Sequence, residues 1–194
     1  MTFPPRPYLH PALSVDTLQE FTGEPSAIEA LVHAYYADVY RLAVSILEEV
    51  EDAEEVAQDT FIAAAAGLER FRGDSKLKTW LFGIAINLCR TRLRKRRSRM
   101  VLQHALEALH FLRPSQPSPE EIVEHAELHT RLWDAIQALD EKHRLPVILH
   151  YLHELSVPEI SEILTLEPGT VYSRLHYARK KLHFLLKHSP PPSP

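Results

Sequence analysis

Proline clusters at three places in this chain of 194 residues and divides it into segments. Four prolines lie in the first eleven residues, three lie between residues 114 and 119, and four lie in the last five residues. Proline restricts φ and removes a backbone donor, so a helix does not continue through such clusters. We therefore expect an irregular N-terminal arm over residues 1–25, a linker over 101–126 and a disordered tail over 189–194. The sequence leaves open whether the arm contains a short helix around Val15–Phe21.

The two stretches between these segments have a helical pattern. In the first, apolar residues recur every three or four positions, as at Leu31, Tyr35, Val39, Leu42 and Ile46. No stretch alternates with a period of two, and five glycines leave little hairpin chemistry. The pattern predicts an all-α protein of two small helical domains, over residues 26–100 and 127–188, joined by the flexible linker.

Capping residues predict three helices in the first domain. The first follows the cap Ser26, and the second follows the cap Asp52 and runs to about Phe71. The third begins after Asp74 or Ser75 and runs to about residue 97. Its buried stripe is expected to consist of Leu77, Leu81, Ile84 and Leu88.

Three broad classes of protein are excluded by the composition. A single cysteine, Cys89, rules out an internal disulfide framework and a multi-cysteine zinc site. No run approaches the eighteen or so apolar residues that a membrane-spanning helix needs. The first ten residues contain three prolines and no apolar core, so they do not form a signal peptide. We expect a cytoplasmic protein that is not inserted in a membrane.

The formal net charge of −4 hides an uneven distribution. Residues 76–100 carry nine basic and no acidic side chains, whereas residues 1–50, 51–75 and 101–140 each carry a net −5. Residues 141–194 carry a net +2. A basic block in an acidic chain is the electrostatic pattern of a phosphate-binding surface. A solvated basic helix face is the alternative interpretation.

Helical spacing favours nucleic acid over the solvated face. One row along the third helix, away from its apolar stripe, consists of Gly83, Asn87, Arg90, Arg94 and Arg97. The guanidinium fork suits phosphate, and an asparagine amide can both donate to and accept from a base edge. Like charges spaced by one turn repel each other unless an anion neutralises them. Gly83 leaves room for a close approach, although a packing role is the alternative.

The turn before this helix, residues 71–80, combines aromatic, cationic and hydroxyl side chains. This mixture is typical of sites that capture unstacked bases of single-stranded DNA. For Trp80 itself, packing in the core is the favoured interpretation.

Residues 155–182 predict a helix-turn-helix. Ser156 and Glu159 have the spacing of a capping box. Residues 165–167 make the turn, and Pro168 opens the second helix. In DNA-binding proteins the N-terminal half of such a helix reaches base edges, while flanking cations hold phosphates. The expected buried stripe of the second helix is Val171, Leu175, Ala178 and Leu182.

An enzyme or a metal protein is the competing class. His125 and His129, and likewise His150 and His153, have spacings that can chelate a metal. Neither pair has a cysteine partner or the His-Glu-x-x-His order, and the chain has no glycine-rich phosphate loop or nucleophile motif. We expect no enzymatic activity, no metal and no cofactor.

Four motifs, in order and at suitable separations, resemble those of the extracytoplasmic-function (ECF, group four) sigma factors of bacterial RNA polymerase, in the sigma-70 family. The resemblance covers residues 28–100 and 127–186. The motifs are DAEEVAQDTF at 52–61, RFRGDS at 70–75, TWLFGIAIN at 79–87 and GTVYSRLHYAR at 169–179.

The resemblance implies three sets of contacts. Sigma domain two would dock on the clamp helices of the largest polymerase subunit through Asp52, Glu55, Gln58, Asp59 and Phe61. The same domain would bind and melt the minus-ten element through Phe71, Arg72, Asp74, Ser75, Lys76, Lys78, Thr79, Asn87, Arg90, Arg94 and Arg97. Sigma domain four would read the minus-thirty-five element through Thr170, Tyr172, Ser173, Arg174, His176, Tyr177, Arg179, Lys180 and Lys181.

The implied partners are core RNA polymerase, promoter DNA and an anti-sigma factor. Domain four would also bind the polymerase β-subunit flap tip. A sigma-like regulator that occupies polymerase without initiating is the alternative function.

This sequence departs from the family pattern at several positions. Tyr172 and Tyr177 stand where many members have a cation, which should weaken phosphate contacts and alter the promoter sequence that is read. A run of alanines, Ala63–Ala66, replaces the usual tryptophan of the second helix.

Overall fold

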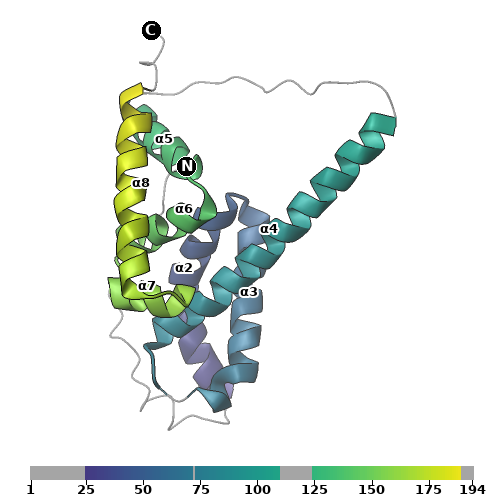
Figure 1. Cartoon of the computed structure of the whole chain (residues 1–194). Coiled ribbons are helices and arrows are strands. Elements are labelled where there is room, and N and C mark those ends of the chain that lie inside the picture. The colour runs from purple at the N-terminus through teal and green to yellow at the C-terminus, as the bar shows by residue number, and fades with distance from the viewer. Residues whose placement is uncertain (1–24, 72, 110–123, 189–194) are drawn as a thin grey trace. The chain divides into compact units, whose positions relative to one another are not determined.

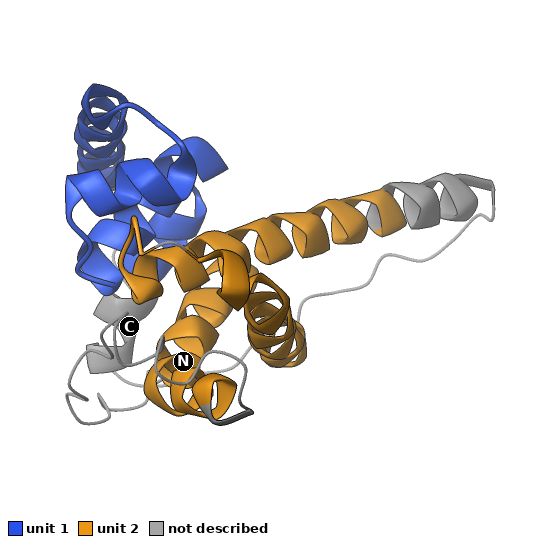
Figure 2. Cartoon of the chain, turned by 90° about the horizontal axis from the view of Figure 1, so that it is seen from below, with its two compact units in different colours: residues 1–3, 112–194 blue, residues 4–111 orange. Residues whose placement is uncertain are grey.

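The computed structural model describes residues 25–71, 73–109 and 124–188 (Figure 1). The described residues fall into two compact units, one within residues 4–111 and one within 112–194 (Figure 2). All regular structure in these ranges is helical, as the sequence predicts. No helix among the described residues is both long and apolar enough to cross a membrane. Residues 1–24 of the expected N-terminal arm, the middle of the expected linker (110–123) and the tail over 189–194 lie outside the described residues.

The first unit is a bundle of three helices that all pack on one another. They are α2 (Pro25–Leu47), α3 (Val50–Gly67) and α4 (Leu77–Leu109), and a 3-10 turn, η1 (Leu68–Arg70), follows α3. Between α2 and α3 the chain reverses at Glu48, whose φ of 64° is left-handed. The tight reversal positions α3 antiparallel to α2 and joins the two helices with only two residues.

Each predicted helix start in this unit is shifted in the structure. Pro25, a residue suited to the first helical position, begins α2, so Ser26 lies inside the helix. The left-handed turn at Glu48 starts α3 earlier than expected, with Glu49 at the N-cap and Asp52 in the first turn. The first residue of α4 is Leu77, later than Asp74 or Ser75.

The ends of two helices also differ from the prediction. The α-helical part of α3 stops at Gly67, before the 3-10 turn that leads to Phe71. In contrast, α4 continues past Arg97 to Leu109, so the first nine residues assigned to the linker are helical. That stretch contains only residues that a helix accepts, without Pro or Gly, and the prolines that marked the linker come later.

The buried face of α4 is wider than predicted and is rotated. Leu77 and Leu81 are buried as expected, but Ile84 and Leu88 are only partly buried. The helix contacts both α2 and α3, and so it needs two adjacent apolar rows rather than one. The additional buried residues are Phe82, Ala85, Ile86 and Cys89.

The second unit contains a helix-turn-helix on two supporting helices. Helix α5 (Glu124–Gln137) begins three residues before the predicted boundary at 127, and α6 (Glu141–Val147) widens into a π-helical turn, η2 (Ile148–Leu152). Helices α7 (Val157–Leu164) and α8 (Pro168–His188) form the helix-turn-helix.

The capping and turn chemistry of the helix-turn-helix is confirmed. The Glu159 N–H donates to the Ser156 hydroxyl, and a Glu159 carboxylate oxygen accepts from the Ser156 N–H at 2.8 Å. After α7, Thr165 adopts a left-handed conformation with φ of 55°, which turns the chain toward α8. Three residues of the predicted stripe on α8 are buried, namely Val171, Leu175 and Ala178. The fourth, Leu182, is only partly buried.

Candidate nucleic-acid interface

The basic helix α4 uses its arginines in two different ways. Arg92 faces α3, where its guanidinium lies 3.3 Å from Asp52 Oδ1 and 2.5 Å from Glu55 Oε2. One turn further on, Arg96 Nη2 lies 3.0 Å from Glu49 Oε1. These two cations are neutralised within the unit and bind α4 to the start of α3.

The predicted row for DNA lies on a different face of α4. Asn87, Arg94 and Arg97 are exposed and Arg90 is partly exposed. Arg94 Nη2 donates to Thr91 Oγ1 at 3.2 Å, a contact within its own helix. This face keeps a concentration of positive charge with no acidic side chain among its members, as phosphate binding requires.

Gly83 stands at the head of this row. A Cβ atom built there would meet no atom within 4 Å outside the backbone of its own helix. Packing therefore does not require a glycine at this position. The open space is consistent with the expectation that something outside the unit approaches here.

A pocket of about 450 Å³ opens between the end of α3, the turn after it and the start of α4. Its aromatic side is formed by Phe71 and Trp80, whose ring centroids lie 4.8 Å apart. A Cβ atom at Gly67 would lie 3.2 Å from Trp80 Cζ2, so the glycine allows the indole to pack close to α3. The lining residues are Ala63, Gly67, Arg70, Phe71, Asp74, Ser75, Trp80 and Ile84.

The pocket contains part of the minus-ten set and adds residues that the sequence interpretation missed. Phe71, Asp74 and Ser75 were expected and do line it. Trp80 was expected in the core, but it is only partly buried because it forms a pocket wall. The spacing of Ala63 and Gly67, and of Trp80 and Ile84, is one helical turn and could have identified the two walls. Arg72 lies outside the described residues, and Lys76 is exposed without lining the pocket.

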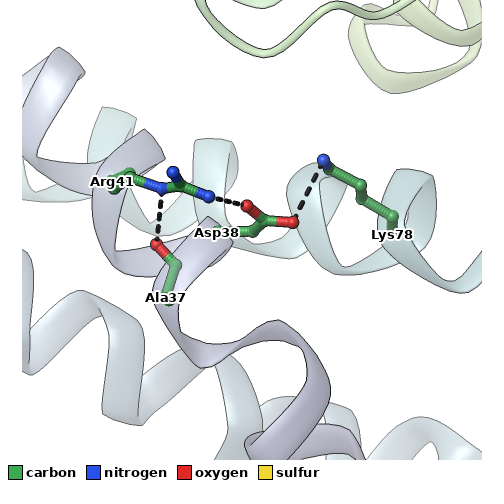
Figure 3. A network of polar contacts seen from close by, with 4 residues as sticks. All are labelled: Ala37, Asp38, Arg41 and Lys78. Carbon is green, nitrogen blue, oxygen red and sulfur yellow. Dashed lines mark hydrogen bonds and ion pairs between the residues drawn. The ribbon is translucent and has the colours of Figure 1, made fainter. Parts of the chain in front are cut away.

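Two other residues of the expected DNA-binding set are buried or ion-paired within the first unit. Thr79 is 1% exposed, so it belongs to the core of the first unit. Lys78 Nζ lies 3.1 Å from Asp38 Oδ2 on α2, and Asp38 also pairs with Arg41 (Figure 3). Lys78 therefore faces α2, whereas Thr79 is enclosed within the first unit.

The carboxylate of Asp38 is mostly withdrawn from water between these cations (Figure 3). Burial alone would raise the pKa of Asp38, but the charges and hydrogen bonds of Lys78 and Arg41 outweigh it, so the pKa lies below its ordinary value. This ion pair joins α2 to the first turn of α4, directly beside the pocket-forming turn. The ion pair thus fixes Lys78 beside α2, and its expected contact with DNA stays a prediction.

The polymerase-binding set on α3 is also divided. Gln58 and Asp59 are exposed, whereas Asp52 and Glu55 pair with Arg92. Phe61 is 5% exposed and its ring stacks on Tyr36 of α2, with centroids 6.1 Å apart. The ring therefore packs inside the first unit and supports α3, and its expected contact with polymerase stays a prediction. The neighbouring Ile62 is 68% exposed and is the most exposed large apolar side chain of α3.

Helix α8 presents most of the residues predicted to read the minus-thirty-five element to solvent. Thr170, Arg174 and Lys181 are partly buried, and the Ser173 hydroxyl donates to the Thr170 carbonyl at 2.9 Å. The exposed members of the set are Tyr172, Ser173, His176, Tyr177, Arg179 and Lys180. Apart from Arg179 and Lys180, the exposed members of this set carry no fixed positive charge.

One aromatic contact on this face was not foreseen. The Tyr177 ring stacks on the His143 ring of α6, with centroids 4.4 Å apart. His143 Nδ1 in turn binds the carboxylate of Asp140. The hydrogen bond from His143, helped by the charges of Lys142 and Lys181, holds the pKa of Asp140 below its ordinary value.

The histidine pairs considered as metal ligands are placed differently. His150 Nδ1 lies 2.9 Å from the Leu155 carbonyl oxygen, so this nitrogen acts as a donor within the fold. The side chains of His125 and His129 lie outside the described residues. Among the side chains that the structure does describe, no group of three potential metal ligands comes together.

Comparison with known families matches both units. Residues 31–99 match the family Sigma-70 region 2, and residues 129–182 match the family Sigma-70, region 4. The first match includes α3, the pocket and the exposed arginine row. The second includes the helix-turn-helix.

Relatives and solved structures agree with these matches. The chain is 33% identical to the ECF RNA polymerase sigma factor SigW of Bacillus subtilis, covering 85% of this chain and 91% of that protein. It is 34% identical to the RNA polymerase sigma-H factor of Pseudomonas aeruginosa, covering 82% and 86%. CnrH, solved in complex with the cytosolic domain of CnrY, has a TM-score of 0.65 at 27% identity over 89% of this chain and 95% of that one.

A second solved relative is the sigma factor RpoE of Bartonella quintana in complex with the anti-sigma factor NepR. It has a TM-score of 0.63 at 26% identity and covers 84% of this chain and 98% of that one. Both regions of the sigma-70 family are present in the order that the four motifs predict. The chain therefore belongs to the ECF RNA polymerase sigma factors of the sigma-70 family.

Proposed function

We propose that this sigma factor directs core RNA polymerase to promoters by reading the minus-ten element with its first unit and the minus-thirty-five element with its second, and that it helps to melt the DNA. The observation that carries the proposal is the pocket beside the exposed arginine row of α4. The pocket suits a base that is extruded from the duplex. The arginine row suits the phosphates of the DNA strand on either side of that base.

The chemistry of the pocket supports capture of a single unpaired base. Phe71 and Trp80 supply aromatic surface for stacking, which is sequence-tolerant because every base has a π face. Asp74 and Ser75 supply polar groups that can read a base edge. A base held here would stabilise a melted strand, since the cost of unstacking is met by contacts that duplex DNA cannot make.

The phosphates of that strand would be held by α4. Asn87, Arg90, Arg94 and Arg97 share a face of α4 that differs from the face on which Arg92 and Arg96 pair with α3. In the second unit, α8 would enter the major groove with its exposed tyrosines, His176 and basic residues. Tyr172 and Tyr177 make this face less cationic, so selectivity there would depend more on shape and hydrogen bonding than on charge.

Docking on the polymerase clamp helices would use the exposed part of α3, with Gln58, Asp59 and the apolar Ile62 at its centre. Asp52 and Glu55 would contribute from the edge, where they already bind Arg92. The second unit would bind the β-subunit flap tip. Because the polymerase provides the catalytic centre for RNA synthesis, the sigma factor needs none of its own.

Control by an anti-sigma factor is part of the proposal. CnrH was solved with the cytosolic domain of CnrY, and RpoE of Bartonella quintana was solved with the anti-sigma factor NepR. An anti-sigma partner that covers the polymerase-binding and DNA-binding faces would keep this chain inactive.

Run-off transcription with core RNA polymerase tests the proposal. A mixture of promoter fragments with randomised minus-ten and minus-thirty-five elements serves as template, and core polymerase without the chain is the control. We expect transcripts from a restricted set of fragments only when the chain is present. Binding to core polymerase without transcripts would support the alternative of a non-initiating regulator, and the absence of binding would contradict both functions.

A further inference from the structure

The side chain of Tyr177 packs against another helix on one face of its ring. It is 53% exposed on α8, and its ring lies against His143 at an interplanar angle of 26°. His143 itself is 9% exposed and belongs to α6, which packs against α8. One face of the tyrosine ring is thus covered by a buried ring from another helix, and the rest is presented to solvent.

His143 is fixed from its other side. Its Nδ1 binds the carboxylate of Asp140, the residue immediately before α6. The Asp140 carbonyl also accepts from the backbone N–H groups of His143 and Arg144, each at 2.9 Å. Both the backbone and the ring of His143 are therefore tied to the start of α6, and a histidine held in this way has little rotational freedom.

This arrangement distinguishes Tyr177 from the other exposed tyrosine of the recognition helix. Tyr172 is 61% exposed and stacks on no aromatic ring among the described residues. A side chain that must be ordered when it meets DNA loses rotamer freedom, and one that is already held by a neighbour loses less. A fixed ring also presents its edge in one orientation, which is what discrimination between bases requires.

We propose that His143 is a positioning residue for promoter recognition: by stacking on Tyr177 it sets the orientation in which this tyrosine meets the minus-thirty-five element, and so determines the base preference at the position that Tyr177 contacts. The inference rests on the proposed role of α8 in reading that element. His143 itself would not contact DNA and would act only through Tyr177.

The test uses the full chain bound to core RNA polymerase and promoters randomised across the minus-thirty-five element. His143→Leu places an apolar side chain of similar size in the buried position and removes both the ring and the bond to Asp140. His143→Phe also removes the bond to Asp140 but retains an aromatic ring. We expect H143L to reduce base discrimination at one position by about two- to tenfold, the scale of an aromatic pair, and H143F to keep most of it. The salt dependence of binding should not change, because no Lys or Arg is altered.

A double-mutant cycle separates positioning from a general structural effect. In a Tyr177→Ala background, H143L should cause no further change in base preference, whereas in a Tyr172→Ala background it should still reduce discrimination. An unchanged preference in H143L, or an H143F variant that behaves like H143L, would overturn the inference. If the wild-type chain selected no minus-thirty-five sequence at all, the proposed role of α8 would be wrong instead.

Discussion

Arg92 of α4 donates to a Glu55 carboxylate oxygen of α3 at 2.5 Å, across 37 residues of sequence. This contact assigns the arginines of α4 to two tasks. Arg92 and Arg96 hold the helix on the acidic start of α3, whereas Arg90, Arg94 and Arg97 lie on the face that we propose for DNA. The same contact links the helix proposed to bind DNA to the helix proposed to bind polymerase.

Replacing one arginine from each face should separate stability from DNA binding. We expect Arg92→Ala to lower the free energy of unfolding by about 1 kcal/mol, because it removes two partly exposed ion pairs. Arg94→Ala should leave stability nearly unchanged but weaken promoter binding, and it should reduce the slope of log affinity against log salt by about 1. Urea unfolding and binding titrations at several salt concentrations measure both effects. An Arg92→Ala variant with normal stability would contradict the assignment of this residue.

The Asp38 ion pair predicts a pH dependence of stability. Since the pKa of Asp38 is lower in the folded state, its contribution to stability is complete above the pKa of about 4 that an unfolded aspartate has. It is lost as the pH falls through the lower pKa of the folded state. We expect Asp38→Asn to be less stable than the wild type at pH 7, with the difference shrinking below about pH 4. Urea unfolding of both proteins across this range measures it, and a difference that grows on acidification would contradict the network in Figure 3.

Replacement by alanine should have different effects at the two glycines near the proposed DNA-binding surface. Gly83 lies inside α4 in open space, so Gly83→Ala should stabilise the protein by about 0.5–1 kcal/mol. Gly67→Ala would bring a methyl group to 3.2 Å from Trp80 and displace the indole that forms the pocket wall. We expect it to shift the fluorescence of Trp80, measured with Trp133→Phe as background, and to reduce promoter melting in permanganate footprinting. An unchanged Trp80 spectrum with full melting would show that the pocket does not depend on this close approach.

Features that depend on residues close together in the sequence were predicted better than features that depend on long-range contacts. The capping box at Ser156 follows from spacing within a few residues, and so does the exposure of Arg94 and Arg97 on one face of α4. The pairing of Lys78 with Asp38 could not be predicted in this way, because its partners are 40 residues apart and meet only when α2 and α4 pack.

The burial of Phe61 and Thr79 was missed for the same physical reason. Which side of a helix is buried depends on how many neighbours it has, and α4 packs on both other helices of its unit. A single apolar stripe, the simplest interpretation of its sequence, describes a helix with one neighbour. The pocket beside Trp80 likewise arises from the ends of two helices and the turn between them, which no single motif contains.

The only cysteine of the chain provides a test of packing in the first unit. Cys89 is fully buried on α4, and burial raises the pKa of its thiol to about 12, so almost no thiolate forms near neutral pH. We expect thiol-specific reagents to react with the native protein at pH 8 only as fast as the unit opens, and at the rate of a free thiol in denaturant. Arg92→Ala should accelerate the native reaction by loosening α4 from α3, whereas Arg94→Ala should not. Rapid labelling of the wild-type protein at pH 8, without denaturant, would contradict the packing of α4 described here.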